Sequence, residues 1–198
     1  KITFVRYKKL IAKFGTVDKA WEAELPELVA AGIEEHIATE FIVWREHLDT
    51  THIERQLETE GVTAVPIGHD SYPARLAQIN DPPIVLFVRG VLPTSFQPTV
   101  AVIGTRKCTQ YGRVITKEIA SALAQSGVAV VSGLALGIDG IAHEAALDVH
   151  GTTVAVLGSG VDALHVHPAT HRRLAEAIIA EGGALVSEYP PGFMPTSY

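Results

Sequence analysis

Four short apolar runs in the second half of the chain are spaced so that one helix fits between each pair. The runs VAVIG, VAVV, TVAVL and ALVS begin at residues 100, 128, 153 and 184, so the intervals are 28, 25 and 31 residues. A βαβ unit needs roughly 30 residues. Continuously apolar strands are typical of parallel sheets that are covered on both faces. The spacing therefore predicts an α/β fold with a doubly wound, mainly parallel, Rossmann-like sheet.

Two further apolar runs precede these four. TAVPI at 63–67 and IVLFV at 84–88 are rich in β-branched residues and predict two more strands. The segments between the later runs have helical periodicity, for example at Ile115, Ile119 and Leu123, which share one helical face. The composition, 47% hydrophobic and 19% charged, excludes a disordered chain and fits a sizeable buried core.

The first part of the chain has a different pattern, which predicts a small helical domain of two to four helices. Gly15 is a plausible helix stop, and Gly61 ends a longer helix. The apolar positions Ile37, Phe41, Trp44 and Leu48 lie on one face of that helix. We therefore expect a helical domain at 1–61 and a Rossmann-like domain at 62–198.

The charge distribution is uneven and limits where a nucleic acid can bind. The formal net charge is −6, which argues against a broadly basic surface. Residues 1–19 hold six basic side chains and one acid, whereas residues 20–60 hold two basic side chains and eleven acids. A nucleic-acid site must therefore be a local basic patch on an acidic body.

Cysteine content and hydropathy indicate a cytoplasmic protein. A single cysteine excludes a disulfide framework and fits a reducing compartment. No apolar run approaches the roughly 18 residues that span a bilayer, and no signal-peptide pattern opens the chain. The chain begins with lysine, which indicates a piece of a longer protein.

Three of the predicted strands lead into small, glycine-bearing loops, where open α/β sheets bind their ligands. The loop residues that we expect to bind phosphate or DNA are Gly104, Thr105, Arg106 and Lys107, then Ser132, Gly133, Gly137 and Asp139, and finally Gly158 and Gly160. Glycine lets main-chain amides approach a ligand, and helix N-termini favour anions. Arg106 adds a fork of donors and Lys107 a point charge. The alternative is that these glycines only make tight turns.

The common nucleotide-enzyme motifs are absent or incomplete. Residues 158–163 satisfy G-x-G-x-x-A, but Pro168 follows too soon for a long helix. The strand that ends at Ser132 and Gly133 lacks the acidic residue that an NAD site places on the ribose. Neither a phosphate-binding P-loop nor a G-x-S-x-G nucleophile turn occurs. We therefore expect no nucleotide cofactor.

Catalytic and metal sites are also disfavoured. His165, His167 and His171 could suggest a metal, but Pro168 interrupts the spacing and no acidic cluster joins them. They fit solvated histidines or rim histidines that contact phosphate. Asp139 and His143 lie four residues apart and could act as acid and base, but a loop-orienting role for Asp139 is favoured. We expect no catalytic residue and no metal.

Several longer motifs resemble the DNA-processing protein A family, also called DprA or Smf. They are VAVIGTRKCTQYG, SGLALGID with IAHEAAL, AVLGSGVD, HPATHRRLAEAI and GGALVSEYPPG, in this order over residues 100–192. The N-terminal part, from KKLIAKFG to the stretch at 70–90, resembles the family's lead-in, which follows a helix-hairpin-helix or SAM-like module.

The resemblance implies a non-catalytic Rossmann-like protein, usually a homodimer, that binds single-stranded DNA. It also implies delivery of that strand to the RecA recombinase during natural transformation. Arg106 matches the arginine of the family's G-[ST]-R motif, a DNA-phosphate contact, and Gly104 and Thr105 shape the same turn. The frequent Tyr-Pro-x-x-Asn pattern is His167-Pro168-Ala-Thr-His171 here, and the chain ends before an expected Phe-Pro-x-Arg-Asn-Arg segment.

Two other classes of function remain open from the sequence. One is a nucleotide-processing enzyme, such as a phosphoribohydrolase of the lysine-decarboxylase-like group, although its Pro-Gly-Gly-x-Gly-Thr type loop is absent. The other is an interaction protein whose loops hold no nucleic acid.

Overall fold

The computed structural model describes residues 2–95 and 97–194. The α-helices are α1 (Phe4–Phe14), α2 (Val17–Glu22), α3 (Leu25–Ala30), α4 (Glu35–His47), α5 (Thr50–Glu60), α6 (Gln110–Gln125), α7 (Ile138–Leu147) and α8 (Arg172–Ala180). The strands are β1 (Val62–Pro66), β2 (Val85–Gly90), β3 (Thr99–Ala101), β4 (Ala129–Ser132), β5 (Thr153–Leu157) and β6 (Ala184–Ser187). Two 3-10 turns are η1 (Leu76–Gln78) and η2 (Ala169–His171).

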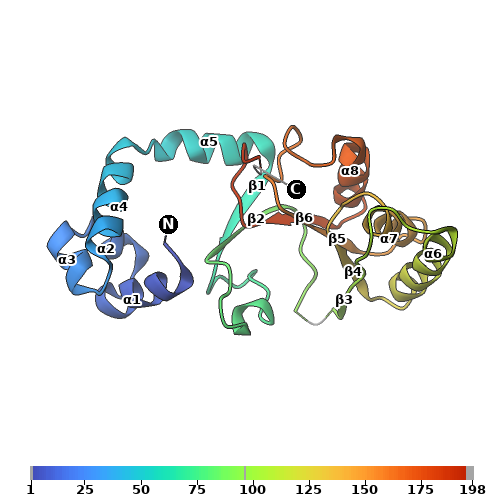
Figure 1. Ribbon diagram of the computed structural model, residues 1–198, viewed down its shortest axis with the longest axis horizontal. Helices are drawn as coiled ribbons and strands as arrows, with labels where there is room; N and C mark the ends of the chain where they lie inside the picture. Colours follow the sequence, from blue (N-terminus) through green and yellow to red (C-terminus); the bar gives the residue numbers. More distant parts are fainter. Residues whose placement is uncertain (1, 96, 195–198) are drawn as a thin grey trace.

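The six strands form one sheet in the order β1-β2-β6-β5-β4-β3 (Figure 1). Strands β3, β4, β5 and β6 are parallel, whereas β1 pairs antiparallel with β2, and β2 antiparallel with β6. All six predicted strands are present, and α6, α7 and α8 occupy the three predicted crossovers. The prediction of an α/β fold with a mainly parallel sheet and an N-terminal helical region is therefore confirmed.

The expectation that helices cover both faces of the sheet is wrong for the described residues. Helix α7 packs against both α6 and α8, and all three lie on one face of the parallel strands. The cause is the strand order: β3, β4, β5 and β6 follow one another in space as in sequence. Right-handed crossovers that advance in a single direction place every helix on the same side. On the other face, Tyr72 and Leu76 from the segment at 67–84 pack against β1, β2 and β6.

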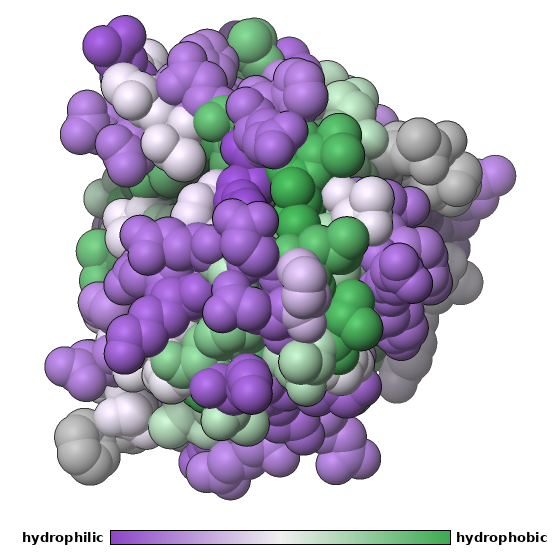
Figure 2. Space-filling model, turned by 90° about the vertical axis from the view of Figure 1, so that its left-hand side faces the viewer, coloured by the Kyte–Doolittle hydropathy of each residue, from purple (hydrophilic) through white to green (hydrophobic). Residues whose placement is uncertain are grey.

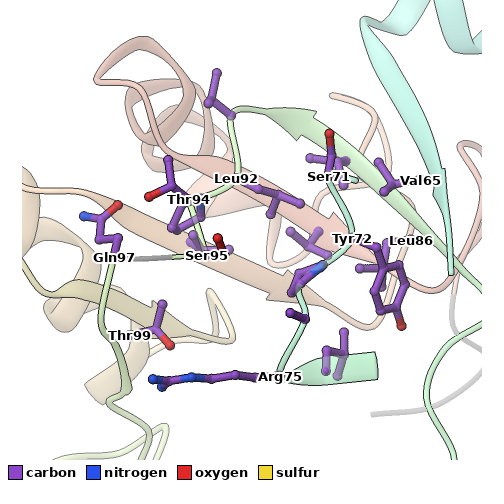
Figure 3. Close-up of a pocket in the computed structure, with 18 of the residues that line it drawn as sticks. Val65, Ser71, Tyr72, Arg75, Leu86, Leu92, Thr94, Ser95, Gln97 and Thr99 are labelled. Carbon is purple, nitrogen blue, oxygen red and sulfur yellow. The ribbon is translucent and has the colours of Figure 1, made fainter. Parts of the chain in front are cut away.

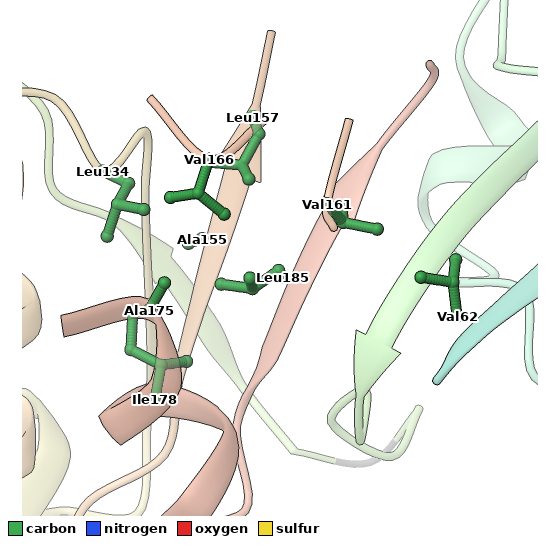
Figure 4. Close-up of a cluster of buried hydrophobic side chains, with 9 residues drawn as sticks. All are labelled: Val62, Leu134, Ala155, Leu157, Val161, Val166, Ala175, Ile178 and Leu185. Carbon is green, nitrogen blue, oxygen red and sulfur yellow. The ribbon is translucent and has the colours of Figure 1, made fainter. Parts of the chain in front are cut away.

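The main core lies between α8 and strands β5 and β6 (Figure 4). Ile178 of α8, Leu185 of β6 and Leu134 of the β4–α7 connection are fully buried there. Full burial of one such side chain stabilises the fold by about 1.5–3 kcal/mol. This core fixes α8, and with it the residues that lead into the helix, against the carboxyl end of the sheet.

The described part of residues 1–61 contains five helices, so the prediction of two to four was wrong. The single long helix expected before Gly61 is two helices, α4 and α5, separated at Leu48 and Asp49. The Asp49 side chain caps α5 by accepting from the His52 amide at 3.0 Å. Gly15 and Gly61 end α1 and α5 as predicted, both with positive φ. Helices α1 to α4 share a separate core around Leu28 and Ala38.

Candidate anion-binding site

The loops after β3 and β4 meet at the carboxyl edge of the sheet through Gly137. This residue has a φ of +84°, and a Cβ there would lie 2.3 Å from the Thr105 carbonyl oxygen and 2.6 Å from that of Arg106. Only glycine permits this approach. The Ile138 amide then donates to the Thr105 carbonyl at 3.2 Å. The first and second predicted loops are therefore in direct contact.

A buried carboxylate braces the same two loops from inside. Asp139 is only 7% exposed; its Oδ1 accepts from the Gly104 amide at 3.3 Å and its Oδ2 from the Gly133 amide at 3.2 Å. The Ser132 hydroxyl donates to the Val102 carbonyl at 2.6 Å. The Gly104 and Gly133 amides, expected to hold an external anion, are thus bonded to an anion of the protein itself. Gly104, Ser132, Gly133 and Asp139 position the loops and do not line the pocket described next.

A pocket of about 230 Å³ lies between the first loop, the N-terminal turns of α6 and α7, and His171. We call it the anion pocket. Its lining residues are Arg106, Lys107, Cys108, Arg113, Gly137, Gly140, Ile141, Glu144 and His171. Three permanent cations therefore face one carboxylate. Arginine suits phosphate because its planar fork can donate two parallel hydrogen bonds.

The first loop presents these cations through a local turn. The Lys107 amide donates to the Thr105 hydroxyl at 3.2 Å, which tightens the turn at Arg106. Helix α6 then begins under a Thr109 cap, whose hydroxyl accepts from the Gly112 amide at 3.1 Å. Arg113 follows one residue later and brings the third cation to the pocket. Thr105 thus shapes the turn, while Arg106, Lys107 and Gly137 line the anion pocket.

Two histidines lie at α7: His171 lines the anion pocket, and His143 lies on the helix itself, outside the pocket lining. The His171 Nδ1 donates to the Leu134 carbonyl at 2.8 Å. His143 is fully buried, and its Nδ1 donates to the Thr153 hydroxyl at 2.7 Å, which in turn donates to the Val130 carbonyl. The His143 Nε2 has no hydrogen-bond partner among the described residues. Burial, and secondarily the nearby His171, lower the pKa of His143 to about 3.

The depressed pKa of His143 predicts a stability that falls with acid. Below pH 6.5, the ordinary pKa of histidine, residue 143 takes up a proton in the unfolded chain but stays neutral in the folded chain. The free energy of unfolding should therefore drop by about 1.4 kcal/mol per pH unit below pH 6.5, until the folded value is approached. Urea titrations between neutral pH and about pH 5 measure this slope.

The substitution His143→Asn keeps a donor for Thr153 but does not titrate in this range. It should lower stability at neutral pH and flatten the pH slope. An unchanged slope in this variant would show that other groups cause the acid sensitivity.

The third predicted loop is not brought to the anion pocket. The Gly160 amide donates to the Phe193 carbonyl at 2.9 Å, and Asp162 accepts from the Gly192 amide at 2.8 Å and from His165. Burial raises the pKa of Asp162, but hydrogen bonds from His165 and Gly192 outweigh it, so the net shift is downward. The turn that holds Gly158 and Gly160 is therefore bonded to the segment that follows β6.

Six of the nine pocket residues were not selected from the sequence as site residues, and Arg113, His171 and Glu144 are the ones whose side chains bear most on binding. Arg113 was missed because it lies inside a predicted helix, although it follows Arg106 by seven residues and stands one turn into that helix. His171 was considered only as a rim histidine. Glu144 gave no sequence signal, because an acid on a helix is ordinarily solvated.

The basic N-terminal segment is largely engaged within the helical region. Arg6 forms an ion pair with Glu34 at 2.9 Å, and the Lys9 ammonium donates to the Gly32 carbonyl at 2.7 Å. The Lys8 ammonium lies 4.9 Å from the centre of the Phe4 ring. Figure 2 shows the end of the molecule that the N-terminal helices form, where a band of hydrophobic residues runs between hydrophilic ones. These contacts favour a structural role for the segment.

A larger groove, of about 820 Å³, lies on the sheet face that lacks helices (Figure 3). Val131, Val154 and Val186 form part of its floor, and Tyr72 and Leu92 part of its walls. All of the lining residues of this groove belong to the described chain, and among them Arg75 is the one lysine or arginine. A surface of this kind does not suit a polyanion, so the smaller anion pocket is the better candidate for phosphate.

The described residues offer neither a metal-ligand cluster nor a membrane-spanning helix. No group of three or more His, Cys, Asp or Glu side chains in the described chain is placed to hold a metal ion. Among the same residues, no helix combines the length and apolar character needed to cross a bilayer.

Comparison with known proteins points to one family. The family model described as DNA recombination-mediator protein A matches residues 63–198. The Smf protein of Escherichia coli is 42% identical over 142 residues, which cover 72% of this chain and 37% of that protein. The Smf protein of Synechocystis is 35% identical over 196 residues, which cover 96% and 48%. The chain thus spans less than half the length of these relatives.

Two solved structures are similar as well. The X-ray structure of DNA processing protein A from Streptococcus pneumoniae matches with a TM-score of 0.77 and 31% identity, over 99% of this chain and 66% of that one. DNA processing protein A from Helicobacter pylori matches with a TM-score of 0.57 and 32% identity, over 69% and 59%. The latter structure is described as showing a single-stranded DNA binding mode.

Proposed function

The chain belongs to the DNA recombination-mediator protein A family, and we propose that it binds single-stranded DNA through phosphate contacts in the anion pocket. The observation that carries the proposal is the convergence of Arg106, Lys107 and Arg113 on one small pocket of a protein whose net charge is −6. Main-chain and side-chain donors to phosphate position a strand without reading its bases. Binding should therefore depend little on base sequence.

We propose different roles for the predicted site residues. Arg106 and Lys107 contact phosphate, and Arg113 joins them. Thr105 and Gly137 shape the pocket wall, while Asp139 holds Gly104 and Gly133 in place behind it. Gly158, Gly160 and Ser132 act at a distance from the phosphate.

The wider role of the whole protein is proposed from the family. The chain acts in the cytoplasm as part of a homodimer that passes single-stranded DNA to the RecA recombinase during natural transformation, without catalysing a reaction. The family match and the single-stranded DNA binding mode described for the Helicobacter pylori structure support this over the nucleotide-processing enzyme. The division into domains at 1–61 and 62–198 also remains a proposal, and Lys1 and residues 195–198 lie outside the described residues.

Arg106→Ala should weaken binding of every single-stranded sequence about tenfold to a hundredfold, since a hydrogen bond to a charged group contributes about 1.5–3 kcal/mol. The slope of log affinity against log salt should fall by about 0.7 for each lost phosphate contact. Fluorescence anisotropy with strands of about 20 nucleotides, at several salt concentrations, measures both quantities.

Arg55→Ala is the matched control, because Arg55 is an exposed arginine of α5 and does not line the pocket. It should leave affinity and salt slope nearly unchanged. Wild-type affinity in Arg106→Ala would contradict the assignment of the anion pocket.

A further inference from the structure

The His171 ring is held in one orientation against the wall of the anion pocket. A carbonyl oxygen can only accept, so the 2.8 Å contact with Leu134 requires a proton on the His171 Nδ1. The ring also packs on Gly140, where a Cβ would lie 2.6 Å from the ring Cε1 and 3.2 Å from Nε2. The neutral ring therefore carries its lone pair on Nε2, and that atom lies beside Gly140, which lines the anion pocket.

We propose that His171 binds a DNA phosphate only as the imidazolium, so that strand binding takes up one proton at this residue; the inference rests on the proposed function. The non-ester oxygens of a phosphodiester only accept hydrogen bonds. The neutral Nε2 lone pair opposes them, whereas a protonated Nε2 donates a charge-assisted hydrogen bond. Affinity for the strand thus rises as the pH falls through the range in which histidines titrate.

The surrounding charges allow this coupling. The charged or titratable groups around His171 are Arg106 and Lys107 from the first loop, Cys108 beside them, Arg113 from α6, His143 and Glu144 from α7, and Arg172 and His167 on its own segment. A bound phosphate brings to the pocket the negative charge that the imidazolium needs.

The other nearby histidines are poor candidates for this proton. His143 is fully buried, and the same burial that lowers its pKa keeps it neutral. His165 is already bonded to the Asp162 carboxylate, outside the pocket lining. His171 is the histidine that the described part of the pocket presents to a ligand.

Two probes test the inference: a thymidine 20-mer and an abasic phosphodeoxyribose strand of the same length, about 20 units each. Affinity is measured by anisotropy at about pH 6 and about pH 8 at constant ionic strength. Proton uptake is measured by calorimetry in two buffers of different ionisation enthalpy. We expect the wild type to bind both probes about tenfold more tightly at the lower pH, since the uptake of one proton on binding changes an affinity by at most about tenfold per pH unit.

Variants locate the proton. His171→Gln carries a permanent amide donor and should bind with little pH dependence and without the proton uptake. His171→Asn keeps a donor for Leu134 but does not extend to the pocket, so it should bind weakly at both pH values. His150→Gln removes an exposed histidine that pairs with Glu181 and should behave as wild type.

The outcomes separate the inference from the proposed function. Unchanged pH dependence and proton uptake in His171→Gln would overturn the inference alone. Tighter binding at the higher pH, or pH dependence with the thymidine strand only, would overturn it in favour of a base N–H that donates to the neutral ring. Failure of the wild type to bind either probe at both pH values would contradict the proposed function and the inference with it.

Discussion

Replacing Gly137 by alanine is expected to lower the free energy of unfolding by at least about 3 kcal/mol and to abolish tight binding of single-stranded DNA. The added Cβ would lie 2.3 Å from the Thr105 carbonyl oxygen and 2.6 Å from that of Arg106. Both neighbours are main-chain atoms, so the clash is relieved only by separating the first loop from α7. That movement carries Arg106 and Lys107 away from the residues of α7 that line the other side of the anion pocket. Urea unfolding and anisotropy on the same preparation measure the two effects.

Gly127→Ala is the matched control for this substitution. Gly127 has a similar φ of +77°, but nothing lies within 4 Å of its added Cβ. The free energy of unfolding of this variant should fall only by the cost of a positive φ at alanine, about 1 kcal/mol. Its DNA binding should stay at the wild-type level. Equal losses in both variants would show that backbone strain, and not the contact between the loops, explains the requirement for glycine at residue 137.

Asp139→Asn should lower the free energy of unfolding by about 2–4 kcal/mol. A buried donor that is left without an acceptor costs about 1–3 kcal/mol, and more when a charged group was involved. The asparagine oxygen can accept from one of the Gly104 and Gly133 amides, but its NH2 group then faces the other donor. The anion pocket should loosen and DNA affinity should fall, even though Asp139 does not line it. Thermal and urea unfolding report the first effect, and anisotropy the second.

Asp148→Asn controls for the loss of one negative charge on α7, because Asp139 lies in the first turn of this helix and Asp148 is its C-cap residue. Asp148 is exposed and pairs with Lys117, so its loss should change stability by less than about 1 kcal/mol. Tighter DNA binding by a stable Asp139→Asn protein would contradict the bracing role, because it would mean that the carboxylate repels the strand directly.

The strands and crossover helices were predictable because their signals are local. Apolar runs such as TVAVL and the intervals between them identify strands wherever they lie in the sheet. The order of the strands is not local: nothing in β2 indicates that it lies beside β6. The assumption of helices on both faces failed at this point. Asp49 is, by contrast, a local signal that was missed. This capping residue lies within a helical pattern of apolar residues and divides the one expected helix into two.

The candidate site divides in the same way. Arg106 and Lys107 were identified because they follow a strand directly, and the structure brings them together with Gly137. The use of the amides was misjudged, because a sequence does not say which carboxylate reaches which N–H. Gly160 is bonded to Phe193, more than thirty residues away, and His171 enters the pocket only because α8 docks on the sheet. Such long-range contacts have no counterpart in local spacing.

The Asp139 carboxylate also bears on the speed of recognition. Without DNA, the Gly104 and Gly133 amides at the strand ends are already bonded to the Asp139 carboxylate. This carboxylate takes the place that a DNA phosphate would otherwise fill. The loops need no rearrangement before encounter, so capture should approach the rate set by diffusion and electrostatic steering. Substitutions that leave the charge of the pocket unchanged should then shorten the lifetime of the complex and leave its formation rate largely intact.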